Sequence, residues 1–128
     1  MALDVLRALT REPASVAAFA TELDLARGAD PRLDAAITRT QSAVRAAAGS
    51  RGAGVDGSAA AQTGARALVE QLATTLQACL LTRFAPAYLS EAFVASRLDA
   101  GHGHTFGTLP SDLVDACAAD VIDRAFLL

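Results

Sequence analysis

Two histidines, His102 and His104, are separated by a single glycine and follow Asp99 closely. Imidazoles two residues apart on an extended loop can meet one metal ion, but zinc needs at least a third protein ligand in fixed geometry. Asp99 is the nearby candidate for that ligand, and Gly101 and Gly103 leave the backbone loose. We therefore expect solvated loop histidines and no metal site.

Four aspartates recur near the C-terminal end of the chain. They are Asp112, Asp115, Asp120 and Asp123. Acid–base catalysis needs two carboxylates in different environments beside a cleft. Helical spacing places these four mostly along one polar face, so the sequence favours a solvated surface. Tyr88, Cys79 and Cys117 have no evident activating partner, and we expect no catalytic residue in this chain.

The two cysteines are too few and too far apart to indicate a disulfide scaffold. Cys79 lies within an apolar helical stripe, which predicts a buried, reduced thiol in a cytoplasmic protein. A secretory signal is not evident, because Asp4 and Arg7 interrupt the early apolar run.

The 11 lysine and arginine positions are all arginines, and the formal net charge is −3. Arg7 and Arg11 lie one turn apart in the first predicted helix, and Arg83 and Arg97 end two central helices. A fold that gathers them makes a guanidinium cluster suited to phosphate contacts. Alternatively, each solvates a helix end or pairs with an acid, and the acidic balance gives no general attraction to nucleic acid. Arg7 and Arg11 are the candidate nucleic-acid-binding residues.

Prolines and capping residues mark where the helices that carry these side chains begin and end. Residues 2–11 form the first helix, and Pro13 occupies the first position of the second, where a missing N–H costs nothing. Gly28 is its expected C-terminal stop. Asp30 then caps a third helix that begins at Pro31.

Apolar spacing predicts the faces of the later helices. The third helix carries Leu33, Ile37 and Val44 on one face. The fourth has leucines at four-residue steps: Leu68, Leu72, Leu76 and Leu80. Pro86 separates it from a fifth helix that packs Leu89, Phe93 and Val94. The last helix has Ser111 as its N-cap and an apolar face made by Val114, Ala118, Val121 and Ile122.

At 128 residues and 13.1 kDa, the chain is expected to form one domain over residues 1–128. A glycine-rich segment, 49–58, is the expected flexible connection between its halves. A compact fold of this mass has roughly 6,400 Å² of surface. The most apolar helix contains Glu70, Gln71 and Gln77, which indicates a core helix and not a membrane span. We predict an all-α fold, an antiparallel helical bundle of about five to six helices.

Several segments form an ordered series along almost the whole chain. They are residues 3–9, 11–13, 22–30, 67–81, 83–86, 92–98 and 106–110. In this order they resemble the C-terminal helical domain of AidB-like acyl-CoA dehydrogenases, the adaptive-response or alkylation-response family. The glycine-rich segment is the least specific part of the resemblance.

The resemblance implies FAD and acyl-CoA chemistry in the full-length family, and oligomerisation through this helical region. Some members bind double-stranded DNA here, and Arg7 matches an arginine that they present to DNA. A second basic position of the family falls in the loop after Asp99, where this chain has Gly101 and His102. The family's flavin site lies upstream of the position that matches Leu3, so we expect no cofactor in this chain.

These observations favour a detached C-terminal helical domain that forms homo-oligomers or docks onto flavin-bearing acyl-CoA dehydrogenase subunits. We expect no dehydrogenase activity from this chain alone, because the flavin performs the hydride chemistry. Two alternatives remain: a module that binds double-stranded DNA, and one subunit of a split FAD-dependent acyl-CoA dehydrogenase.

Overall fold

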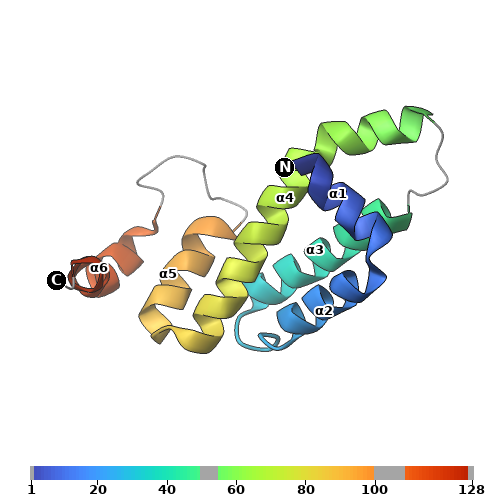
Figure 1. The fold of residues 1–128 in the computed structure, drawn as a ribbon. Coiled ribbons are helices and arrows are strands. Elements are labelled where there is room, and N and C mark those ends of the chain that lie inside the picture. The colour runs from blue at the N-terminus through green and yellow to red at the C-terminus, as the bar shows by residue number, and fades with distance from the viewer. Residues whose placement is uncertain (1, 50–54, 100–108, 127–128) are drawn as a thin grey trace.

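The computed structural model describes residues 2–49, 55–99 and 109–126, and within them it contains six helices and no strand. The helices are α1 (Ala2–Arg11), α2 (Pro13–Asp24), α3 (Pro31–Gly49), α4 (Val55–Phe84), α5 (Ala87–Arg97) and α6 (Ser111–Ala125) (Figure 1). The prediction of an all-α fold is confirmed.

Helix α4 is the longest element, and the other helices are arranged along it. Helices α1, α2 and α3 lie against one part of α4, while α5 runs beside its C-terminal part (Figure 1). Helix α6 packs mainly against α5, at the opposite end of the molecule from α1–α3. None of the helices in the described ranges combines the length and hydropathy that crossing a membrane requires.

The predicted helix starts are largely confirmed. Pro13 is the first residue of α2, and the Asp30 carboxylate accepts a hydrogen bond of 2.7 Å from the Arg32 amide at the start of α3. Gly28, in the turn between α2 and α3, has a φ of 86°, a left-handed conformation that glycine adopts without strain. The Ser111 N-cap was wrong by one residue: Pro110 is the N-cap, and its carbonyl accepts the first α6 hydrogen bonds.

The glycine-rich connection predicted at residues 49–58 overlaps the ends of both neighbouring helices. Helix α3 continues through Gly49, and α4 already begins at Val55. Alanine has the highest helix propensity, and runs of it at 46–48 and 59–61 extend both helices toward the glycines. Residues 50–54 lie outside the described part of the chain.

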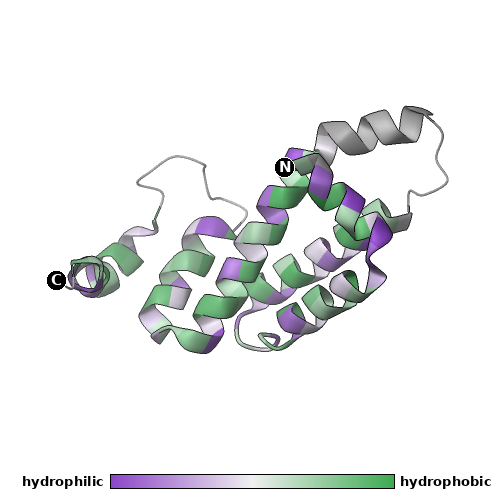
Figure 2. Ribbon diagram, in the orientation of Figure 1, coloured by the Kyte–Doolittle hydropathy of each residue, from purple (hydrophilic) through white to green (hydrophobic). Residues whose placement is uncertain are grey.

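The core lies where α2, α3, α4 and α5 meet, and Figure 2 shows hydrophobic segments on each of these helices. Its fully buried members are Leu23, Ala26, Leu33, Ile37, Ala78, Cys79 and Val94. The predicted face of α3 is confirmed, because Leu33 and Ile37 are 0% exposed and Val44 is 4% exposed. Small side chains make up much of this core, so the helices approach closely and each residue buries little area.

The leucine stripe predicted for α4 is not its buried face. Leu68, Leu72 and Leu76 are only half-buried, and Leu80 is 38% exposed. The side chains of α4 that are buried are smaller: Ala65, Thr75, Ala78 and Cys79. The four-residue spacing of the leucines correctly predicts a helix, but it does not identify the buried face of that helix. The close approach of α3 requires small side chains at the contact, so the leucines lie beside it.

The apolar face predicted for α6 is also only partly buried. Cys117 is 3% exposed and faces the core, whereas Val114 is 42% and Ile122 55% exposed. Helix α6 has one main neighbour, so a single strip of its surface is covered. The prediction assumed that the bundle would enclose the helix more completely.

We expect Leu33→Ala to reduce the free energy of unfolding by about 2 to 5 kcal/mol, because it empties a fully enclosed site. The matched change Leu80→Ala removes the same atoms from a partly exposed position and should cost less than about 1 kcal/mol. Urea unfolding followed by circular dichroism measures both. Equal losses in the two variants would show that the core is placed wrongly.

Candidate functional site

The candidate metal and acid–base residues do not assemble into a site within the described residues. His102 and His104 lie outside these residues. Over the part of the chain that the structure describes, no group of three His, Cys, Asp or Glu side chains could hold a metal ion. The four aspartates of α6 are exposed, as the prediction of a solvated polar face requires: Asp112, Asp115, Asp120 and Asp123.

The arginines singled out by sequence are distributed over the molecule and do not form one cluster. The guanidinium of Arg7 pairs with Asp4 at 3.0 Å, and both side chains are 66% exposed. Arg83 pairs with Glu22 and lies over the ring of Phe84, 4.6 Å from its centre. Pairing with acids reduces the net positive charge that each arginine offers to a phosphate. DNA contact by Arg7 and Arg11 stays a prediction.

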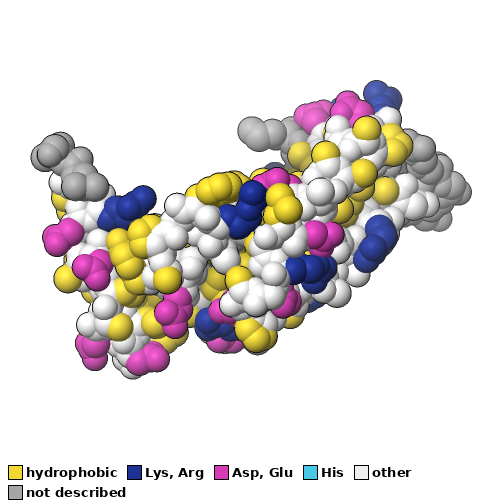
Figure 3. All heavy atoms as spheres, turned by 90° about the horizontal axis from the view of Figure 1, so that it is seen from below, with side chains coloured by type: hydrophobic (Ala, Val, Ile, Leu, Met, Phe, Trp, Pro, Cys, Tyr) yellow, Lys and Arg dark blue, Asp and Glu magenta, His cyan; other side chains and the backbone are white. Residues whose placement is uncertain are grey.

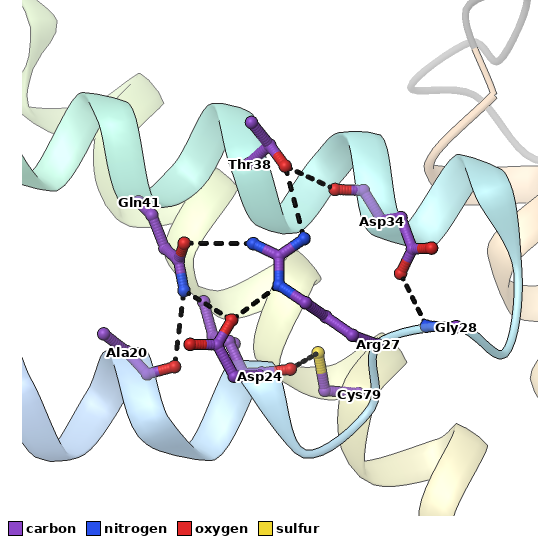
Figure 4. Close-up of polar contacts among 9 residues, drawn as sticks. Ala20, Asp24, Arg27, Gly28, Asp34, Thr38, Gln41 and Cys79 are labelled. Carbon is purple, nitrogen blue, oxygen red and sulfur yellow. Dashed lines mark hydrogen bonds and ion pairs between the residues drawn. The ribbon is translucent and has the colours of Figure 1, made fainter.

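A polar network closes the turn between α2 and α3 (Figure 4). Arg27 donates hydrogen bonds to Asp24 at 2.6 Å, to Gln41 at 3.0 Å and to Thr38 at 3.3 Å. Gln41 in turn donates to Asp24 at 2.9 Å, which completes a ring of contacts between the two helices. The amide of Gly28 donates to Asp34 at 3.0 Å. Because the donors and acceptors satisfy one another, this network fixes the turn and has no reactive group to offer.

The hydrogen bond from Arg27 holds the pKa of Asp24 below its usual range, and the bond from Gln41 lowers it further. The carboxylate form is therefore the one that the folded state favours.

Cys79, on α4, lies against the end of α2 beside this turn and is fully buried. Its thiol points toward the carbonyl oxygen of Leu23 at a distance of 3.8 Å (Figure 4). Burial raises the pKa of the Cys79 thiol to about 11. A thiol in such surroundings stays protonated at neutral pH and is a poor nucleophile. The expectation of a buried, reduced cysteine is confirmed, and Cys117 is likewise free and buried.

An apolar groove runs between α1, α2 and α4, with a volume of about 350 Å³. Ten side chains line it: Val5, Ala8, Leu9, Ser15, Val16, Phe19, Val69, Leu72, Ala73 and Leu76. Ser15 is the polar member of this set. The groove contains Leu72 and Leu76 of the α4 leucine stripe, which explains why these two side chains are only half-buried.

A second hollow, about 260 Å³, lies between α3, α4 and α5 and is polar. Thr40 and Thr75 form the buried floor of this hollow, and their hydroxyl oxygens are 2.9 Å apart. Gln71 donates to the Thr40 hydroxyl at 3.2 Å. Arg39 and Arg97 line the same hollow from α3 and the end of α5. Sequence reasoning singled out Arg97 but not Arg39, and it did not bring the two together.

A signal for this hollow does exist in the sequence. Thr40 continues the buried face of α3, three residues after Ile37 and four before Val44. A polar residue in the register of a core face needs a buried partner, and that partner is Thr75.

Comparisons of the chain with protein-family models, curated proteins and solved structures find no significant match.

We expect Cys79 to resist alkylation by iodoacetamide at about pH 8 in the folded protein, since its thiol is buried and protonated. The Cys117→Ser variant isolates this signal, and mass spectrometry measures the labelled fraction with time. The same variant in concentrated urea should be labelled promptly. Rapid labelling of the folded protein would contradict the buried position.

We expect acid to remove a stabilising contribution of Asp24. Its pKa is lower in the folded than in the unfolded state, so this contribution is complete above the unfolded pKa and disappears as the pH falls through the folded pKa. Between about pH 5 and about pH 2, stability should fall less in Asp24→Asn than in the parent, by under about 1 kcal/mol because the pair is half exposed. Urea unfolding at each pH measures it, and identical pH profiles would refute the expectation.

Proposed function

We propose that this chain is a helical assembly domain that associates with further copies of itself. We also propose that it is an antiparallel bundle related to the C-terminal helical domain of AidB-like acyl-CoA dehydrogenases, a relation supported by the ordered series of segments in its sequence. The observation that carries the assembly role is the apolar surface that α6 leaves uncovered.

Helix α6 presents large apolar side chains to solvent along one side. Val114 and Ile122, eight residues apart on α6, are 42% and 55% exposed. Residues eight apart fall within one broad helical face, and the C-cap residue Phe126, 74% exposed, follows at the end of the helix. Isolated exposed apolar residues are ordinary on protein surfaces, but an aligned set of this kind marks an interaction surface.

The apolar groove between α1, α2 and α4 is a receptor of the right chemistry for that face. It is almost wholly apolar, and an amphipathic helix docks into such a groove through residues spaced by three or four. Helix α6 and the groove lie toward opposite ends of the molecule, so one copy would bring its α6 to the groove of another (Figure 1). This arrangement uses both exposed apolar features in one contact.

Charge does not distinguish the two surfaces. Acidic side chains gather at the α6 end of the molecule, at the left of Figure 3. The helices that line the groove carry both signs, with exposed Arg11 and Arg66 as well as exposed Asp4 and Glu70. The apolar side chains therefore carry the proposed pairing.

The resemblance implies a second partner for these surfaces, a flavin-bearing acyl-CoA dehydrogenase subunit. Self-association is favoured because both apolar surfaces occur on this one chain. A flavin-bearing partner that displaced the self-contact would use the same groove.

Sedimentation equilibrium tests the proposal over a wide range of protein concentration. The parent chain should associate, and Ile122→Asp should weaken association at least about tenfold, because it places an unpaired carboxylate in the contact. Ala73→Asp, an exposed position that lines the groove, should have a similar effect by repelling the acidic α6.

Ala116→Asp is the matched control. It adds the same charge to an exposed position of α6 away from the apolar face and should leave association unchanged. A parent chain that stays monomeric throughout, or three variants that behave alike, would refute the proposed contact.

A further inference from the structure

We propose that the polar hollow between α3, α4 and α5 is a binding site for a small organic carboxylate. The hollow has a volume of about 260 Å³, close to the lower limit of ordinary ligand pockets. It combines a buried hydroxyl floor with two arginines at its sides. It shares no lining residue with the apolar groove, so this inference does not depend on self-association.

The floor of the hollow is a closed pair of hydroxyls. Thr40 and Thr75 share one hydrogen bond, and Gln71 donates a second one to the Thr40 hydroxyl. Thr40 and Thr75 are 0% and 1% exposed, and no buried side-chain oxygen or nitrogen among the described residues lacks a hydrogen-bond partner. The floor therefore gives the hollow a fixed base, and the groups that can bind a ligand stand at its sides.

The sides of the hollow supply positive charge for an anionic ligand. In the described part of the chain, neither Arg39 nor Arg97 makes a hydrogen bond or ion pair. Other arginines of the chain, Arg7, Arg27 and Arg83, are each held by an acid. Two guanidinium groups that line one hollow and are not committed elsewhere can both turn to a bound anion.

The net charge of the lining side chains and the apolar part of the lining indicate which class of anion the hollow would bind. Glu70 also lines the hollow and takes part in an interaction of its own, so the three charged side chains sum to one positive charge. A monovalent carboxylate neutralises that charge, whereas a phosphate dianion would leave an excess of negative charge. Ala36, Ala67 and Leu98 provide apolar wall for a short hydrocarbon body.

In the bound state, the carboxylate would accept hydrogen bonds from Arg39 and Arg97. Hydrogen bonds between a guanidinium and a carboxylate are stronger than neutral ones, and two from separate helices fix the position of the ligand. Such a ligand would also link α5 to α3, two helices that the sequence places far apart.

Titration with sodium butyrate, followed by two-dimensional NMR of the full-length chain, tests the site. Sodium chloride and sodium phosphate at equal ionic strength are the comparison titrations. Butyrate should shift the amide signals of the helix segments around Thr40, Thr75 and Arg97 in a saturable manner. Arg39→Gln and Arg97→Gln should each weaken butyrate binding at least about tenfold.

Arg45→Gln is the matched control, because it removes another α3 arginine that does not line this hollow and should leave binding unchanged. Thermal unfolding of each variant checks that the fold is intact, and a melting curve like the parent's makes the binding result decisive. Absence of saturable butyrate shifts in the parent would overturn the proposal. Tighter binding of phosphate than of butyrate, or equal weakening by Arg45→Gln, would overturn it as well.

Discussion

The close approach of α3 and α4 is the contact on which the rest of the molecule depends. Its α3 side presents Leu33 and Ile37, and its α4 side presents Ala78 and Cys79, so large side chains meet small ones. The Thr40–Thr75 hydrogen bond lies further along the two helices, where it fixes their register at the cost of placing two hydroxyls in the interior. Because small residues occupy the contact, the larger leucines of α4 lie beside it. The apolar groove follows directly from that displacement.

Much of the fold could be predicted from the sequence, because prolines and caps act locally. Pro13, Asp30 and Pro86 mark boundaries that need no knowledge of distant residues. The choice of buried face could not be predicted in the same way for α4 and α6. A leucine stripe and an alanine–cysteine stripe both have helical period, and only the partner helix decides which is covered. Among the described residues, helix α6 has α5 as its main neighbour, and no local signal reports which of its faces that neighbour covers.

The candidate sites illustrate the same limit. Arg7 and Arg11 could be identified because they are neighbours in sequence, but their value as cations depends on Asp4, which binds Arg7. The polar hollow needs Arg39 and Arg97 together, and tertiary packing alone brings them to one place. Thr40 is the residue that sequence could have indicated, since a hydroxyl stands in the register of the α3 core face. Its partner Thr75 is not identifiable without the fold.

The thin attachment of α6 has a consequence for how the chain opens. Local, sub-global unfolding occurs where few buried contacts hold an element, and α6 has one main neighbour, α5. Cys117 is buried on α6, whereas Cys79 is buried between α4 and the α2–α3 turn. We therefore expect the Cys117 thiol to become accessible when the peripheral helix opens, and the Cys79 thiol only when the central core opens.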